Sequence, residues 1–111
     1  MKINIKATKV ELSEELKTYI QRKMDMLDKY LGSVQALNCD VEVGQAIGSH
    51  QAGKIHRCEV NLEVPGELLR VEKMESDLHK AIDKVKDHLA QAITKYKGKK
   101  LDKKRKREEV A

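Results

Sequence analysis

A dense run of basic residues near the C-terminus is the first feature of the sequence that could carry chemistry. Residues 95–107 hold nine Lys or Arg and a single acid, Asp102, whereas residues 1–94 hold 14 Lys/Arg and 15 Asp/Glu. The net charge of +5 therefore comes from this segment. Such a block is either a solvated end or a contact for a polyanion, because Lys and Arg bind phosphates with little regard to sequence. The rest of the chain has to decide between these alternatives.

The histidines and cysteines do not have the spacing of a metal site. Cys39 and Cys58 fall on the apolar phase of strand-like runs, so we expect both to be buried as small hydrophobic residues. No metal-ligand pattern includes these cysteines and the four histidines, which are His50, His56, His79 and His88. We therefore expect neither a metal nor another cofactor.

The sequence also lacks the elements of an active site. Ser49 and His50 are adjacent in the glycine-rich stretch GQAIGSHQAG, but no orienting acid accompanies them and the stretch lacks GK[ST]. The acids mostly alternate along strand-like runs or lie on helix surfaces. We expect a protein that is not an enzyme and has no small-molecule substrate.

Alternating and helical periodicities define the elements that would position the basic residues. Alternation predicts strands at 2–7, 34–43, 54–64 and 68–74, with a loop at 44–53 and a tight turn at Pro65-Gly66. Apolar spacing predicts one helix at 14–31, capped by Ser13, and a second that starts after Ser76 or Asp77 and ends at Gly98.

The element order β-α-β-β-β-α predicts an α+β fold of two layers. Each strand has one apolar face and each helix one apolar stripe, so a four-stranded sheet would bury one face under both helices. We expect a sandwich similar to a double-stranded-RNA-binding domain at 1–98, followed by a basic, disordered tail at 99–111. No apolar run could span a membrane and no signal sequence is apparent, so we expect a cytoplasmic protein. We also expect it to be a monomer in solution.

Three tyrosines are the sole aromatic residues besides histidine. Tyr19, Tyr30 and Tyr96 fall on the apolar helix stripes, so we expect them to pack in the core. This placement argues against reading single strands by base stacking and favours recognition of folded RNA through its backbone and shape.

Two segments resemble one protein family. INIKATKVELSEELKTYIQRKMDMLDKYLG is similar to the opening strand and first helix of the ribosome hibernation promoting factor and ribosome-associated inhibitor A family, also called sigma-54 modulation proteins. SDLHKAIDKVKDHLAQAITKYKGK is similar to the second helix of that family. The resemblance implies the same β-α-β-β-β-α fold, in a short form without the C-terminal dimerisation domain of long members.

The resemblance also implies a function. Family members bind small-subunit rRNA in the channel used by mRNA and tRNA, block translation, and preserve idle ribosomes under stress or in stationary phase. The matching positions are Lys23, Lys95, Lys97 and Lys99, and Lys17 stands where members often have Arg. To these we add further basic residues of the two helices and the tail as candidate rRNA contacts, namely Arg22, Lys80, Lys84, Lys100, Lys103, Lys104 and Arg105.

A protein-binding regulator of a transcription (sigma) factor is the alternative. The polar side of the expected sheet carries Asp40, Glu42, Glu59 and Glu63, which is too acidic for RNA but suits a protein partner. Such a regulator would use this face or the loop 44–53, and its binding would depend little on the basic tail.

Overall fold

A computed structural model describes the backbone of residues 1–46 and 55–110, and side chains as far as Leu101. The expected element order is confirmed, with the first helical segment divided in two. The elements are β1 (Asn4–Thr8), α1 (Glu14–Asp25), α2 (Asp28–Leu31), β2 (Asn38–Gln45), β3 (His56–Val64), β4 (Glu67–Glu75) and α3 (Leu78–Val110).

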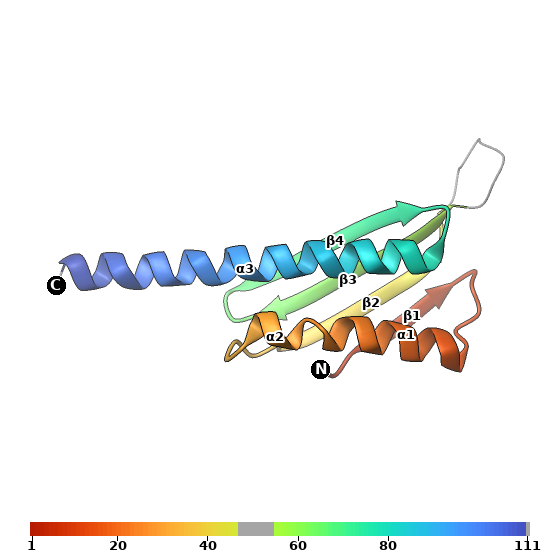
Figure 1. The fold of residues 1–111 in the computed structure, drawn as a ribbon, viewed down its shortest axis with the longest axis horizontal. Helices are drawn as coiled ribbons and strands as arrows, with labels where there is room; N and C mark the ends of the chain where they lie inside the picture. Colours follow the sequence, from red (N-terminus) through yellow and green to blue (C-terminus); the bar gives the residue numbers. More distant parts are fainter. Residues whose placement is uncertain (47–54, 111) are drawn as a thin grey trace.

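The four strands form one mixed sheet in the order β1-β2-β3-β4. β1 pairs parallel with β2, and the other two pairings are antiparallel. All three helices cover one face of this sheet, with α1 and α2 lying alongside α3 (Figure 1). The predicted two-layer α+β class is therefore confirmed, whereas the likeness to a double-stranded-RNA-binding domain stays a prediction.

An aliphatic core lies between the layers. Cross-strand register aligns Ile5, Val41, Val60 and Val71 in one row, which suits the pleated inner face of a sheet. Cys39 and Cys58 are fully buried, as predicted, and burial raises the pKa of each thiol to about 12. The helices contribute the apolar stripes of Leu16, Ile20, Met24, Leu27, Ala81, Ile82, Val85, Leu89, Ile93 and Tyr96.

The prediction of one continuous helix at 14–31 is wrong. Ser13 caps α1 as expected, because its Oγ accepts a hydrogen bond from the Leu16 N–H. The helix is interrupted after Asp25, where the Leu27 N–H donates to the Met24 carbonyl in a tighter turn. α2 then supplies one more turn and ends at Gly32, whose φ of 58° favours glycine.

The predicted end of the second helix at Gly98 is also wrong. α3 begins after Asp77, whose Oδ1 accepts from the His79 N–H, and it continues to Val110. Gly98 does not adopt the positive φ of a helix-terminating glycine, so α3 continues through it at a cost of about 1 kcal/mol relative to alanine. The expected disordered tail thus has a helical backbone over 99–110, and the division of the chain at Gly98 stays a prediction.

Three smaller expectations meet different outcomes. Gly66 has the positive φ predicted for the turn between β3 and β4. Gly44 belongs to β2 rather than to a loop, because it pairs with Thr8 of β1. A Cβ at Gly44 would lie 2.6 Å from the Thr8 carbonyl oxygen, so the close approach of the two strands requires glycine. Leu37, which the alternation over 34–43 puts on the apolar face, lies before β2 and is half exposed. Residues 47–54, including Ser49 and His50, lie outside the described residues.

Candidate nucleic-acid interface on the helical face

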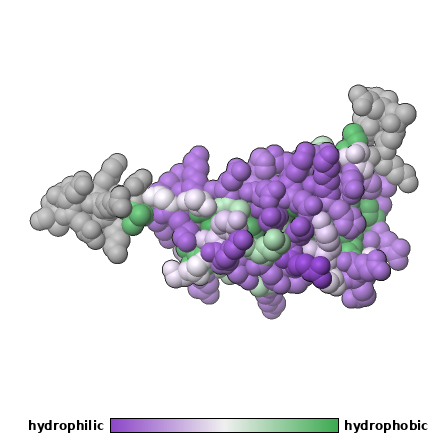
Figure 2. Space-filling model, viewed as in Figure 1, coloured by the Kyte–Doolittle hydropathy of each residue, from purple (hydrophilic) through white to green (hydrophobic). Residues whose placement is uncertain are grey.

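The exposed side of α3 presents a line of polar residues that we call the α3 row. The residues Lys80, Lys84, His88, Gln91 and Lys95 follow each other at spacings of three or four, so their side chains share one side of the helix. All five are exposed. The view onto the helices is predominantly hydrophilic, with smaller apolar areas among the polar ones (Figure 2).

The lysines of the α3 row differ in how far their charge is already compensated. Lys84 forms an ion pair with Glu75 at the end of β4, and this hydrogen bond lowers the pKa of Glu75. Lys80 and Lys95 form no ion pair with any side chain that the structure describes. Their charge is therefore free for a polyanion.

A polar cluster fills the contact between α1 and α3. The Tyr19 hydroxyl donates to Asp83 at 2.5 Å, and the Lys23 ammonium lies 3.1 Å from the same carboxylate. Burial alone would raise the pKa of Asp83, but these two hydrogen bonds outweigh it and lower the pKa. Burial, with the bond to Asp83, raises the pKa of Tyr19 to about 12. Lys23 is only 22% exposed, and the carboxylate of Asp83 offsets much of its charge.

Lys17 lies away from the α3 row. Its ammonium is 3.3 Å from Glu14, and it lines a shallow hollow with Arg22, Ile3 and Ile5 on the β1 side of α1. Arg22 also borders a second hollow with Tyr19, so it lies between the two sides of α1. The structure therefore brings Lys80, Lys84 and Lys95 together but separates Lys17 from them.

The last buried turn of α3 is fixed to the β3–β4 turn. The Tyr96 hydroxyl donates to the Pro65 carbonyl at 2.5 Å, and Lys99 lies 3.8 Å from Glu67. Lys97 reaches α2 instead, where its Nζ donates to the Tyr30 carbonyl at 3.0 Å. Lys100 lies 5.1 Å from the centroid of the Tyr96 ring. Beyond this point the α3 backbone carries the remaining predicted contacts, Lys103, Lys104 and Arg105.

The sheet surface turned away from the helices, which we call the outer sheet face, is charged but internally paired. Arg57 donates to Glu42 at 3.2 Å and to Glu59 and Glu72 at 2.7 Å each. Arg70 adds a bond of 2.9 Å to Glu59. Glu59 is consequently only 8% exposed, although it points away from the core. These two arginines compensate Glu42 and Glu59, two of the four acids that the sequence placed on this face, whereas Asp40 accepts hydrogen bonds from Asn4 and Asn38.

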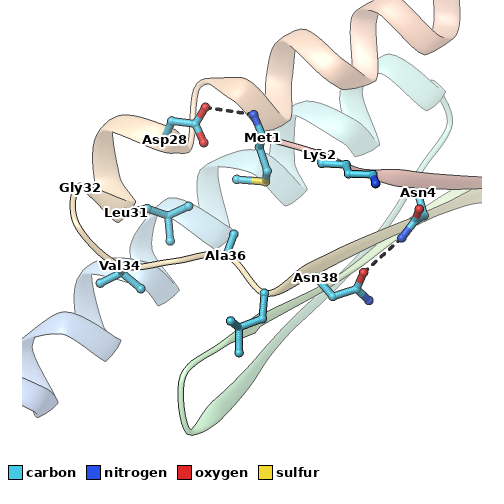
Figure 3. Close-up of a pocket in the computed structure, with 10 residues that line it drawn as sticks. Met1, Lys2, Asn4, Asp28, Leu31, Gly32, Val34, Ala36 and Asn38 are labelled. Carbon is cyan, nitrogen blue, oxygen red and sulfur yellow. Dashed lines mark hydrogen bonds and ion pairs between the residues drawn. The ribbon is translucent and has the colours of Figure 1, made fainter.

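A separate hollow of about 500 Å³ lies where β1 begins and α2 ends. It is lined by polar and apolar side chains, among them Met1, Asn4, Leu31 and Asn38 (Figure 3). The Met1 ammonium closes one side through ion pairs with Asp25 at 3.0 Å and Asp28 at 3.3 Å. Most of its polar groups thus bond to each other, and nothing in it selects a ligand.

Across 1–46 and 55–101, no three His, Cys, Asp or Glu side chains converge as metal ligands would. None of the helices in the described part of the chain has the length and apolar character needed to cross a bilayer.

The fold and its charges define a small two-layer α+β domain with one cationic helix. The chain belongs to the Sigma 54 modulation protein / S30EA ribosomal protein family, whose sequence model matches residues 3–101. The resemblance inferred from the sequence is thereby confirmed.

Relatives of two lengths match the chain. It is 30% identical over 88 residues to a ribosome hibernation promotion factor of Deinococcus radiodurans, covering 79% of this chain and 44% of that protein. It is 26% identical to the ribosome hibernation promoting factor of Escherichia coli, covering 89% of this chain and 96% of that protein. The chain thus spans about half the length of several curated relatives and nearly all of another.

Solved structures agree with the fold. The N-terminal domain of Thermus thermophilus Protein Y matches with a TM-score of 0.69 and 28% identity, covering 86% of this chain and 99% of that one. A ribosomal subunit interface protein from Coxiella burnetii matches with a TM-score of 0.72 over 88% of this chain and 99% of that one. Its identity of 18% supports the fold alone.

Proposed function

We propose that this protein is a ribosome-associated hibernation factor. It binds rRNA of the small subunit in the channel used by mRNA and tRNA, blocks translation, and stabilises idle ribosomes under stress or in stationary phase. It acts in the cytoplasm as a monomer, by binding rather than by catalysis. Family membership and the similarity to ribosome hibernation factors support an association with ribosomes.

The arrangement of charge on α3 carries this proposal. Lys80 and Lys95 are exposed and unpaired among the described side chains, and the same helix continues into the most basic segment of the sequence. Phosphates bound along such a line release their counterions, which yields affinity without reading bases. The proposed contacts are Lys17, Arg22, Lys23, Lys80, Lys84, Lys95, Lys97, Lys99, Lys100, Lys103, Lys104 and Arg105.

Co-sedimentation with purified bacterial ribosomes over a salt series tests the proposal. We expect the full chain to bind the small subunit with a slope of about −4 to −5 in log affinity against log salt, if about six phosphates are neutralised. A truncation after Lys97 should bind more weakly and with a shallower slope. Absence of binding by the full chain at low salt would refute the ribosomal function.

The name of the family suggests a second candidate function, that of a regulator that binds a sigma factor. The outer sheet face would then supply the interface, and binding would show a shallow salt slope and survive the truncation. The internal pairing of Glu59 with Arg57 and Arg70 weakens this candidate, since little charge on that part of the face remains for a partner.

A further inference from the structure

A hollow between α2 and α3 interrupts the helical face and is not explained by charge alone. It has a volume of about 610 Å³, within the range of ligand sites, and it is open to solvent. Its lining combines an aromatic ring, small residues and polar groups, namely Tyr30, Asp87, Ala90, Gln91, Thr94 and Lys95.

Tyr30 forms the aromatic wall of this hollow. The prediction that it packs in the core is wrong, because 37% of its surface is exposed. The Lys29 ammonium lies 5.1 Å from the ring centroid, where it interacts with the π-system. The Tyr30 backbone is held by Lys97, so the ring stands on a fixed support. An exposed, supported ring offers a surface on which a planar group can stack.

The α3 side of the hollow is flat and able to form hydrogen bonds. Ala90 is 9% exposed and brings only a methyl group. The Thr94 hydroxyl donates to the Ala90 carbonyl at 2.9 Å, so its oxygen remains available as an acceptor. Gln91 is exposed and adds an amide that both donates and accepts. The edge of a heterocyclic base needs such mixed partners.

Charge around the hollow suits a phosphate beside a base. Lys95 lines the hollow and has no ion-pair partner among the described side chains. Asp87 is paired with Lys86 at 2.6 Å, which reduces its repulsion of an approaching anion. Its carboxylate can also accept a hydrogen bond from the amino group of a base.

We propose that this hollow binds one unstacked base of single-stranded rRNA, which stacks on Tyr30 while its phosphate contacts Lys95. The inference rests on the proposed function and deepens it, because it adds a base contact to an interface otherwise made with phosphates. Stacking depends little on which base is present, so the site favours unpaired over paired nucleotides rather than one sequence.

The test compares a short labelled oligoadenylate with an abasic oligonucleotide of equal length by fluorescence anisotropy. We expect Tyr30→Leu to weaken oligoadenylate binding about tenfold or more and to leave abasic binding unchanged. Tyr30→Phe keeps the ring and should bind like the wild type. Leu68→Ala is the matched control, since Leu68 is an exposed apolar residue on the outer sheet face. Equal oligoadenylate affinities of Tyr30→Leu and wild type would overturn the inference.

A measurement on the unmodified protein covers the case in which Tyr30→Leu does not fold. A 2-aminopurine placed between abasic positions of an oligonucleotide is unstacked in the free strand, so it should lose fluorescence when it binds and stacks on Tyr30. No binding of the oligonucleotide at low salt, or binding without quenching, would overturn the inference. Sedimentation of the wild type with ribosomes is scored separately, so either result leaves the proposed function to its own test.

Discussion

The outer sheet face and the helical face carry similar kinds of side chain but use them differently. On the outer sheet face, Arg57 and Arg70 bond to the surrounding glutamates, and Glu59 is nearly buried by these bonds. On the helical face, Lys80 and Lys95 are exposed without an ion pair among the described residues. The arginines of the outer sheet face are therefore already paired with acids of the same sheet, whereas Lys80 and Lys95 of α3 remain available for a partner.

The difference shows that composition alone does not identify a polyanion-binding surface. A charge already paired at hydrogen-bond distance has lost much of its water and has little to gain from a second partner. An exposed charge keeps its counterions and can exchange them for phosphates. Five predictions test this contrast between paired and exposed charge.

Glu59→Gln should have the largest effect, and on stability rather than on binding. Loss of the buried charge removes the ionic partner of Arg70 and should lower the free energy of unfolding by about 2 kcal/mol in urea titrations. Glu63→Gln, exposed on the same face, should change it by less than about 0.5 kcal/mol. A large loss of ribosome affinity in folded Glu59→Gln would instead place the outer sheet face in the interface.

The stability effect of Glu59 should depend on pH. Burial alone would raise the pKa of Glu59, but hydrogen bonds from Arg70 and Asn61 outweigh it and lower the pKa. A lowered pKa stabilises the fold above the ordinary value of about 4.3 and ceases to do so as pH falls through the lowered value. The stability difference between wild type and Glu59→Gln should therefore shrink in acid, which urea titrations below pH 4 would show.

The double variant Lys80→Gln with Lys95→Gln should affect binding and spare stability. If each lysine neutralises one phosphate, ribosome affinity should fall about tenfold to thirtyfold at physiological salt, and the salt slope should fall by about 2. Lys2→Gln with Lys6→Gln removes equal charge from the β1 side and serves as the control. Equal losses from the two double variants would show that net charge, not the α3 row, sets the affinity.

A third comparison concerns the loss of ribosome affinity when an ion-paired lysine or an unpaired lysine is replaced. Lys23→Gln should weaken ribosome binding less than Lys95→Gln, because Asp83 already offsets the charge of Lys23. We expect about a twofold loss for Lys23→Gln and about a fivefold loss for Lys95→Gln in sedimentation at the same salt concentration. The reverse order would mean that Lys23 leaves Asp83 when the ribosome binds.

The smallest effect should come from the apolar residues of the outer sheet face. Leu68 and Met74 are each more than half exposed, so replacing both with Ala should change stability by less than about 1 kcal/mol. Ribosome affinity should stay the same within the error of sedimentation. Weaker binding by this variant would reveal a contact that the charge pattern does not predict.

Local periodicity predicted most of the architecture. Alternating strands and apolar helix stripes indicated the inner faces correctly, as the burial of Cys39, Cys58 and Tyr96 shows. The α3 row was also visible in the sequence, because residues three and four apart share one side of a helix. Features set by neighbours along the chain were therefore accessible.

Features that depend on residues far apart in the sequence could not be predicted from it. Lys23 pairs with Asp83, sixty residues away, and Glu59 is buried by an arginine from another strand. Tyr30 lies on an apolar stripe, but the turn after α1 places it at a hollow beside α3, where 37% of its surface is exposed. Gly98 was interpreted as a helix end from its type alone, although α3 continues past it. Each outcome depends on packing that spacing does not encode.

The contacts of Tyr96 and Lys99 attach α3 to the β3–β4 turn, and the helix projects beyond this point of attachment. The helix runs about 20 Å from Tyr96 to its last residue at 1.5 Å per residue. A tilt of the helix by about 5° at Tyr96 would move its C-terminal end by about 2 Å. The bond from Tyr96 to Pro65 thus fixes the direction of the last turns of α3 and not their charge. Without this bond, the position of the basic end of the helix would vary, whereas its charge would stay the same.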